Sequence, residues 1–358
     1  MKLVVFGLSI SSSWGNGHAT TYRALLRAFA ARGHEVVFYE WDAPWYRENR
    51  DFPRPEFCRL VLYRDWNGVA AEALADAREA DAVLVGSYVK DGPRVVDELA
   101  EAGVDPLFFY DIDTPVTVSA LRGGGAEYLR PDQVGIFTRY FSFTGGPFLH
   151  EVLEAELGAR EAVPLYCSVD PERYRPVAAD PELACELGYM VTYAPDRQPV
   201  VERFLLDVAR RLPERGFVVA GPQYPEDVAW PGNVRHLHHL PPDRHPAFYS
   251  SAAWQLNATR ADMVAAGWSP SVRLFEAAAC GAAMISDRWP GIDRFFTPGR
   301  EILLPESTDE VVAILRGTHP DDRRAIGEAA RARVLAEHTA EHRAEELESL
   351  LRTPARVA

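Results

Sequence analysis

Runs of apolar residues alternate with amphipathic segments along most of the chain. In the first half, short apolar runs predict strands at Leu3–Leu8, Glu35–Tyr39, Arg59–Tyr63, Ala82–Gly86 and Leu107–Tyr110. Segments with helical spacing of apolar residues lie between them, near Ala19–Ala31, Val69–Glu79 and Arg94–Ala102. Strands that alternate with helices predict a parallel sheet with helices on its faces.

The same alternation starts again near Gly188. Its predicted strands are Tyr189–Tyr193, Phe217–Ala220, Val234–His236, Trp254–Asn257, Ala283–Ser286 and Ile302–Leu304. The proline-rich segment Val163–Pro176 separates the two series, and from Pro320 to Leu351 the pattern is helical. The sequence therefore predicts an α/β protein with two Rossmann-like, doubly wound domains, residues 1–165 and 166–335. We expect a hinge to join them and the strand ends of both to face a ligand cleft.

Composition narrows the class of protein. A length of 358 residues suits two domains, and a hydrophobic content of 47% supplies two cores. The net charge of −14 argues against nucleic acid or an anionic membrane as the main partner. No run is long and apolar enough to span a bilayer, and the apolar start reads as a buried strand rather than a signal peptide. The four cysteines lack paired spacing, which predicts reduced thiols, a cytoplasmic location and no zinc site.

Lysine is nearly absent from the chain. Lys2 and Lys90 are the two lysines, so the positive charges of the second half are arginines. The genomic base composition explains this bias without any function. Nevertheless, a phosphate site in the second half must use arginine or backbone N–H groups, and no lysine there can hold a Schiff-base cofactor. We expect no cofactor.

The segment Ser269–Ile285, SPSVRLFEAAACGAAMI, predicts a capped helix that begins after a loop and stops before a buried strand. One of Ser269 and Ser271 is expected to cap the helix, with Pro270 at an early helical position. N–H groups at such a start bind phosphate oxygens, and Gly281 is expected to end the helix.

Two side chains of this helix add to the interpretation. Arg273 is predicted in the first turn, where a guanidinium can bind a diphosphate bidentately. Glu276 lies one turn further on and can accept hydrogen bonds from two ribose hydroxyls. Arg197 follows the first strand of the second half at another predicted helix start, and is either a further diphosphate ligand or a surface arginine. An ordinary capped helix with a solvated acid is the alternative to a nucleotide site.

The loop after the first strand, SISSSWGNGHA, leads into a helix. Gly15 and Gly17 permit tight turns and close backbone approach, and Asn16 adds a hydrogen-bonding group. The spacing is not that of the dinucleotide fingerprint, and no acid clearly ends the second strand in the expected role. His18 sits at the helix start, where the dipole favours a neutral imidazole that can act as a general base. The alternative is that His18 only caps or packs.

The strand Leu107–Tyr110 is followed by Asp111-Ile-Asp113-Thr114-Pro115. Either acid can face the substrate or serve as the base, and either can instead be a helix cap. A metal-diphosphate role is disfavoured, and the run His236-Leu237-His238-His239 lacks the acid or cysteine that would complete a zinc site, so we expect no metal. Thr144 and Gly145 lie in another glycine turn, predicted to face the same cleft.

The chain resembles GT-B-fold glycosyltransferases, specifically the bacterial CgeB-like group, over almost its whole length. SVRLFEAAACGAAMISDRWPGIDRFFTPGREI carries the resemblance most strongly, and SWGNGHATTYRALLRAFAARGHEV, FYDIDTPVT and SFTGG match the same group. In the wider retaining families a glutamate at the position of Glu276 binds the donor ribose. Another glutamate eight residues earlier contacts the sugar, and here that position is Trp268. Arg197 matches the diphosphate arginine of these families, whereas Arg260 or Arg273 must replace their lysine.

The resemblance implies a nucleotide-sugar donor in the second domain, an acceptor in the first, metal-independent transfer of a hexosyl group, and a C-terminal helix, residues 336–358, that crosses back to the first domain. It leaves open the donor base and sugar, the acceptor (small molecule, glycan or protein), the stereochemical outcome, the oligomeric state, and which of His18, Asp111 and Asp113 is the base. A nucleotide-sugar epimerase of the same fold and a non-catalytic sugar-nucleotide-binding protein are the competing functions.

Overall fold

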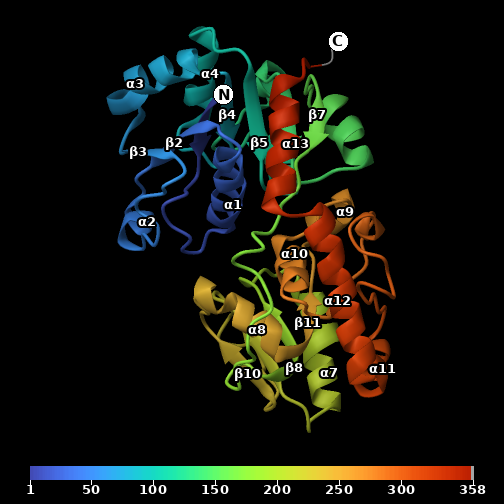
Figure 1. The fold of residues 1–358 in the computed structure, drawn as a ribbon. Helices are drawn as coiled ribbons and strands as arrows, with labels where there is room; N and C mark the ends of the chain where they lie inside the picture. Colours follow the sequence, from blue (N-terminus) through green and yellow to red (C-terminus); the bar gives the residue numbers. More distant parts are fainter. Residues whose placement is uncertain (356–358) are drawn as a thin grey trace. The chain divides into compact units, whose positions relative to one another are not determined.

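The computed structural model describes residues 1–355 and contains two compact units (Figure 1). Unit 1 comprises Met1–Ser168 together with the segment that begins at Ala340, and unit 2 comprises Val169–Thr339. Each unit is an α/β structure built on one parallel sheet, as the alternating pattern predicts.

Unit 1 is built on a seven-stranded sheet in the order β3-β2-β1-β4-β5-β6-β7. Its strands are β1 (Lys2–Gly7), β2 (Glu35–Trp41), β3 (Arg59–Tyr63), β4 (Ala82–Gly86), β5 (Leu107–Asp111), β6 (Arg139–Ser142) and β7 (Ala162–Pro164). Its helices are α1 (Gly17–Ala31), α2 (Pro44–Glu48), α3 (Trp66–Glu79), α4 (Gly92–Glu101), α5 (Thr114–Arg122), η1 (Pro131–Ile136), η2 (Leu149–Glu154) and α13 (Ala340–Arg352).

The central strands of unit 1 are buried on both faces, which explains their continuous apolar runs. Val4 and Phe6 of β1 pack in one core cluster with residues of α3 and α4, such as Trp66 and Val95. Helix α13 lies beside α1, and Arg32 at the end of α1 forms an ion pair with Glu348 (Figure 1). The C-terminal helix is therefore part of unit 1, although it follows unit 2 in the sequence.

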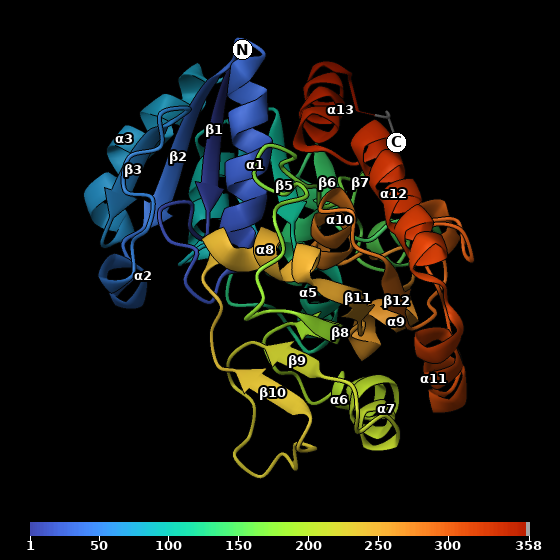
Figure 2. The same cartoon turned by 60° about the horizontal axis from the view of Figure 1, so that its bottom comes forward.

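Unit 2 is built on a five-stranded sheet in the order β10-β9-β8-β11-β12 (Figure 2). Its strands are β8 (Cys185–Met190), β9 (Phe217–Ala220), β10 (Val234–Leu237), β11 (Ala252–Asn257) and β12 (Met284–Ser286). Its helices are α6 (Gln198–Val201), η3 (Glu202–Leu206), α7 (Asp207–Arg211), η4 (Pro242–Arg244), α8 (His245–Ser251), α9 (Ala261–Ala266), α10 (Val272–Ala279), η5 (Ile292–Arg294), α11 (Thr308–Gly317) and α12 (Pro320–Glu337).

Two strand predictions in unit 2 are wrong. The strand predicted at Tyr189–Tyr193 begins earlier, at Cys185, and ends at Met190. Residues Ile302–Leu304 form isolated bridges, Leu303 with Ile285 and Ile302 with Pro298, instead of a further strand of the sheet. Apolar character alone does not distinguish a strand from a buried extended segment that pairs at single residues.

The strand orders of the two sheets share one feature that matters for ligand binding. In each sheet, the first three strands are added toward one edge, and the fourth strand then pairs with the other side of the first, so that later strands are added toward the opposite edge. These switch points lie between β1 and β4 in unit 1 and between β8 and β11 in unit 2. Ligands of doubly wound proteins bind outside the carboxyl ends of the strands at such a point, because the connecting loops diverge there.

Candidate functional site

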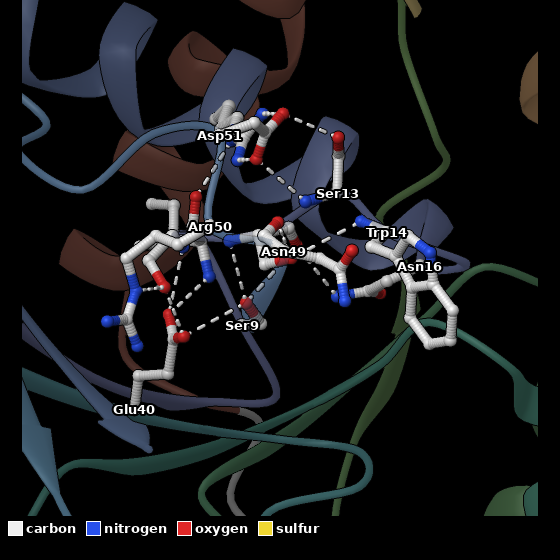
Figure 3. A network of polar contacts seen from close by, with 12 residues as sticks. Ser9, Ser13, Trp14, Asn16, Glu40, Asn49, Arg50 and Asp51 are labelled. Carbon is white, nitrogen blue, oxygen red and sulfur yellow. Dashed lines mark hydrogen bonds and ion pairs between the residues drawn. The ribbon is translucent and has the colours of Figure 1, made fainter. Parts of the chain in front are cut away.

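The loop after β1 is held by a dense polar network around Glu40 (Figure 3). The Glu40 carboxylate, at the end of β2, is fully buried and accepts four hydrogen bonds. Its donors are the hydroxyls of Ser9 and Ser11, at 3.0 and 2.5 Å, and the backbone N–H groups of Ile10 and Ser11, at 2.7 and 2.9 Å. Glu40, the residue before the last of β2, therefore holds the chain's own loop in place, which is not the role of the acid in the dinucleotide fingerprint.

A second carboxylate holds the other end of the same loop. Asp51 accepts hydrogen bonds from the N–H and hydroxyl of Ser13 and forms an ion pair of 2.6 Å with Arg23. Burial works against ionisation, but these hydrogen bonds hold the pKa of Asp51 below its usual range. Arg23 also donates to the carbonyl oxygen of Ile10 at 2.8 Å. The loop that leads to α1 is thus rigidly held before any ligand binds.

The start of α1 agrees in part with the prediction. Gly15 has a φ of +59°, which favours glycine, whereas Gly17 is the first helical residue and adopts no positive φ. Asn16 is the N-cap, and its side-chain oxygen accepts from the N–H of His18 at 3.0 Å. The turn prediction is therefore correct at Gly15 and wrong at Gly17, and Asn16 has a clear structural role.

His18 lies beside Asp113, although 95 positions separate them in the sequence numbering. The imidazole Nε2 is 3.6 Å from Asp113 Oδ2, and the hydroxyl of Tyr88 donates to the same oxygen at 3.1 Å. The side chain of Asp113 is 42% exposed, whereas that of His18 is 11% exposed. His18 Nδ1 is buried and has no hydrogen-bond partner in the described part of the chain. A substrate hydroxyl would therefore meet Asp113 and the Nε2 edge of His18 together.

Tyr88 is a residue of this group that the sequence analysis missed. It follows β4, so strand order brings it to the switch point opposite the start of α1. Its φ of +64° is unusual for a bulky residue, and such strain concentrates at functional positions. Its ring contacts that of His18 edge-on, with centroids 5.2 Å apart. No motif in the sequence marks Tyr88, because its role depends on a conformation and on distant neighbours.

Asp111 is placed differently from Asp113. It is fully buried, and its carboxylate accepts hydrogen bonds from Tyr140 at 2.5 Å and Thr117 at 2.7 Å. Burial raises the pKa of Asp111 to about 6, although both hydrogen bonds act to lower it. Asp113 occupies the N-cap position of α5 without capping through its side chain. This geometry favours Asp113 over Asp111 as the acid that a substrate can reach.

Thr144 and Gly145 have packing roles in the structure. Thr144 is fully buried, and its N–H donates to the hydroxyl of Ser142. A Cβ atom at Gly145 would lie 1.8 Å from the hydroxyl of Tyr166. The glycine is therefore needed because Tyr166 packs directly against the backbone. These contacts explain both residues without an acceptor, so the predicted acceptor role remains a prediction.

In unit 2, three arginines lie at the carboxyl edge of the sheet near the switch point. Arg273 donates from Nε to the carbonyl oxygen of Met190, the last residue of β8, at 2.6 Å. Arg197 follows β8, and its buried Nε has no hydrogen-bond partner among the residues that the structure describes. Burial, and next the charge of Arg273, lower the pKa of Arg197 to about 10. Arg260 is paired with Asp196 at 3.4 Å.

These arginines carry more positive charge than their acidic neighbours balance. Within residues 1–355, neither Arg197 nor Arg273 forms an ion pair, although both side chains are partly buried. A group of positive side chains that repel one another is stabilised when an anion binds. The three arginines predicted as donor ligands are therefore brought together in one region, and that region suits a diphosphate.

The start of α10 corrects the capping prediction. The helix begins at Val272, so Pro270 precedes it, and Ser271 at the N-cap position makes no side-chain cap. Instead, the Ser271 hydroxyl donates to Asn257 Oδ1 at 2.9 Å. Ser269 is buried. The helix ends at Ala279, and Gly281 follows with a φ of +76°, as predicted.

Glu276 lies in the second turn of α10 and is buried, with 6% of its surface exposed. The hydroxyl of Tyr249 donates to its Oε2 at 3.0 Å. This hydrogen bond holds the carboxylate in a fixed position and occupies one of its two oxygens. Its predicted contact with a ribose is untested. Trp268, where related families carry a glutamate, packs on Gly291, so no carboxylate occupies that place.

The histidine run forms a cluster of rings. His236 stacks on Trp230 with centroids 4.9 Å apart, contacts His238 at 4.6 Å, and places Nε2 3.0 Å from the carbonyl oxygen of Gly221. Within residues 1–355, no group of three or more histidine, cysteine, aspartate or glutamate side chains is arranged to hold a metal ion. None of the helices in that part of the chain is long and apolar enough to cross a membrane.

Comparison with known proteins agrees with this arrangement. Residues 197–349 match the family described as glycosyl transferase-like, whereas no curated protein sequence matches the chain. The fold is similar to that of sucrose-phosphate synthase from Thermosynechococcus elongatus, with a TM-score of 0.69, 15% identity and 98% of both chains covered.

Two further structures with this fold were solved with a nucleotide sugar. Anabaena HepE in complex with UDP-glucose has a TM-score of 0.64 at 12% identity, covering 98% of this chain and 99% of the other. An α-glucosyltransferase in complex with UDP-glucose and DNA containing an abasic site has a TM-score of 0.69 at 14% identity, covering 99% and 100%. The chain thus has the GT-B fold, and its residues 197–349 resemble a glycosyl transferase-like family.

Proposed function

We propose that this protein is a glycosyltransferase of the CgeB-like group that moves a hexosyl group from a nucleoside diphosphate sugar to an acceptor hydroxyl. The observation that carries the proposal is the group of Arg197, Arg260 and Arg273 at the switch point of unit 2, where Arg197 and Arg273 form no ion pair with any acid of residues 1–355. The solved structures with UDP-glucose favour a uridine nucleotide as the donor.

The proposed chemistry divides between the units. Unit 2 binds the donor, and unit 1 binds the acceptor beside His18 and Asp113. The acceptor oxygen forms a bond to the anomeric carbon, while the bond between that carbon and the diphosphate oxygen breaks. The hydroxyl proton passes to His18 Nε2 or to Asp113. The leaving diphosphate gains negative charge, which Arg197 and Arg273 stabilise without help from a metal.

The proposed function is tested by binding and by turnover. UDP, GDP, TDP and ADP are compared by thermal shift, because a ligand at 100 times its dissociation constant adds about 2.7 kcal/mol of stability. We expect UDP to give the largest shift. UDP-glucose is then incubated with the protein and a panel of sugar, peptide and small-molecule hydroxyl acceptors, in excess EDTA. Formation of UDP and a glucosylated acceptor is the expected result.

Other outcomes identify the competing functions. Conversion of the donor sugar without any acceptor would indicate a nucleotide-sugar epimerase, whereas tight UDP binding with no turnover across the panel would indicate a binding protein. Activity lost in EDTA and restored by manganese would contradict metal independence and make Asp113 a candidate ligand. Absence of binding to all four diphosphates would contradict the donor site itself.

A further inference from the structure

Asn257, the last residue of β11, is almost completely buried, with 2% of its surface exposed. All the hydrogen-bonding capacity of its side-chain amide is used. Oδ1 accepts from Arg273 Nη1 and from the Ser271 hydroxyl, both at 2.9 Å. Nδ2 donates to the hydroxyls of Thr259 and Ser286, at 3.1 and 2.9 Å. An amide has two acceptor sites and two donor hydrogens, so no partner is missing.

The orientation of this amide follows from its partners. A guanidinium can only donate hydrogen bonds, so the oxygen of Asn257 must face Arg273. The amide therefore joins four structural elements: the end of β11, the loop containing Thr259, the start of α10 and the end of β12. Together with the Met190 carbonyl, it fixes the guanidinium of Arg273 through two of its nitrogens. Nη2 of Arg273 makes no hydrogen bond within residues 1–355.

The chemical nature of this partner matters for charge. Arg273 is partly buried, and an arginine held between structural elements is ordinarily paired with a carboxylate, which cancels its charge. Here a neutral amide and a backbone carbonyl hold Arg273, so its positive charge stays uncompensated. The pKa of Arg197 is lowered, first by burial and next by the charge of Arg273, which agrees with an uncompensated charge on Arg273. Asp287 lies near this network, but its carboxylate accepts from the N–H and hydroxyl of Thr259 and does not pair with Arg273.

We infer that Asn257 is a positioning residue for the diphosphate: it orients Arg273 without neutralising it, and so makes unit 2 selective for the diphosphate part of its ligand. This inference rests on the proposed function, because it presupposes a nucleoside diphosphate in unit 2. Asn257 acts through Arg273 and does not itself contact the sugar or the base.

The test compares Asn257→Asp with the unchanged protein by calorimetry, using UDP and uridine as probes. The substitution keeps the shape of the side chain and adds a carboxylate against Arg273. We expect UDP affinity to fall by about 10-fold or more, as for the loss of one charge-assisted contact, and uridine affinity to change by less than 2-fold. Asn233→Asp is the matched control, since Asn233 is an amide in the same unit that donates to three backbone carbonyls. The control should leave the ratio of UDP to uridine affinity unchanged.

A double-mutant cycle identifies the residue through which Asn257 acts. In Arg273→Gln the charge is already gone, so adding Asn257→Asp should reduce UDP affinity by less than 2-fold more. If Asn257→Asp does not fold, Asn257→Ser provides the same comparison, because it weakens the hold on Arg273 without adding charge. Its expected effect is smaller and again confined to UDP.

The outcomes separate the inference from the function on which it rests. An equal loss of UDP and uridine affinity would show that Asn257 only supports the fold of the region, and would overturn the inference. Additive losses in the double variant would also overturn it. Failure of the unchanged protein to bind UDP, GDP, TDP or ADP would instead contradict the proposed function.

Discussion

The two units have the same strand order around their switch points, but the side chains there are arranged in opposite ways. In unit 1, the loop after β1 is satisfied internally: Glu40 takes four hydrogen bonds, and Asp51 pairs with Arg23. In unit 2, within residues 1–355, Arg197 Nε has no hydrogen-bond partner, and neither Arg197 nor the nearby Arg273 forms an ion pair. A common backbone arrangement therefore supplies the place, and the side chains decide what is bound there.

This difference has consequences for stability. A satisfied buried network stabilises the fold and holds neighbouring groups such as His18 in position before a ligand arrives. A cluster of like charges without ion pairs lowers the unfolding free energy of the ligand-free protein, and binding of an anion raises it again. Substitutions at the two switch points are therefore expected to change stability in opposite directions.

The largest effect is expected from removal of the Glu40 carboxylate. Glu40→Met keeps the length of the side chain but removes the acceptor of four buried donors, of which, in the described part of the chain, only the Ser9 hydroxyl has another acceptor, the carbonyl oxygen of Ser12. The unfolding free energy should therefore fall by about 3–5 kcal/mol. Chemical denaturation measures the change. Glu35→Met, on the exposed end of the same strand, is the control and should change stability little. A loss as small as that of the control would mean that unit 1 does not depend on this network.

The next effect concerns catalysis. If His18 takes the proton in unit 1, His18→Ala should reduce turnover by about 100-fold or more, while UDP affinity in unit 2 stays near normal. Turnover is followed as UDP release from UDP-glucose with an acceptor. His150→Ala, at an exposed histidine of unit 1, is the control. Near-normal turnover of His18→Ala would move the role of base to Asp113.

Asp111 gives a pH-dependent prediction of similar size. Because burial raises its pKa to about 6, the folded protein holds this proton more tightly than the unfolded chain. The stabilisation is complete below the ordinary carboxyl pKa and is lost as pH rises through about 6. In Asp111→Asn the side chain cannot ionise, so this decrease in stability with rising pH is absent.

The unfolding free energy of Asp111→Asn relative to the unchanged protein should therefore rise by about 2–3 kcal/mol between pH 4 and pH 7, at 1.36 kcal/mol per pKa unit. Denaturation series at several pH values measure this change, and Asp105→Asn, at an exposed aspartate, is the control. A difference that does not change with pH would show that Asp111 is ionised in the folded protein throughout this range.

The smallest effect has the opposite sign from that of Glu40. Arg197→Met removes a partly buried charge that other arginines repel, so the ligand-free protein should gain about 1 kcal/mol, while UDP binding weakens. Thermal and chemical denaturation without nucleotide measure the gain, and Arg300→Met at an exposed position is the control. If Arg197→Met destabilises the protein as Glu40→Met does, the contrast between the two switch points is incorrect.

The sequence by itself determined the local features of this protein. Apolar runs located β1 to β5 of unit 1. In β1, β4 and β5 the run is continuous because these strands are buried on both faces. Gly281 marked the end of α10, because a left-handed residue there favours glycine. Arg197 and Arg273 could be named in advance, since each lies at a predicted helix start that follows a strand or loop, whereas Arg260 was named only through the resemblance to GT-B glycosyltransferases.

Only the tertiary structure decided how these positions are used. Glu40 lies within an apolar run, and its role became visible only where the loop after β1 folds over the end of β2. Tyr88 and Asn257 belong to no motif, because each acts through residues that strand pairing brings from elsewhere in the chain. The structure also distinguishes Asp111 from Asp113, which lie only two positions apart in the sequence. Asp111 is buried because it is the last residue of β5, whereas Asp113 lies beyond the end of the strand and is more exposed. Hydrophobic periodicity reports which face of an element is buried, whereas hydrogen-bond partners depend on which elements become neighbours.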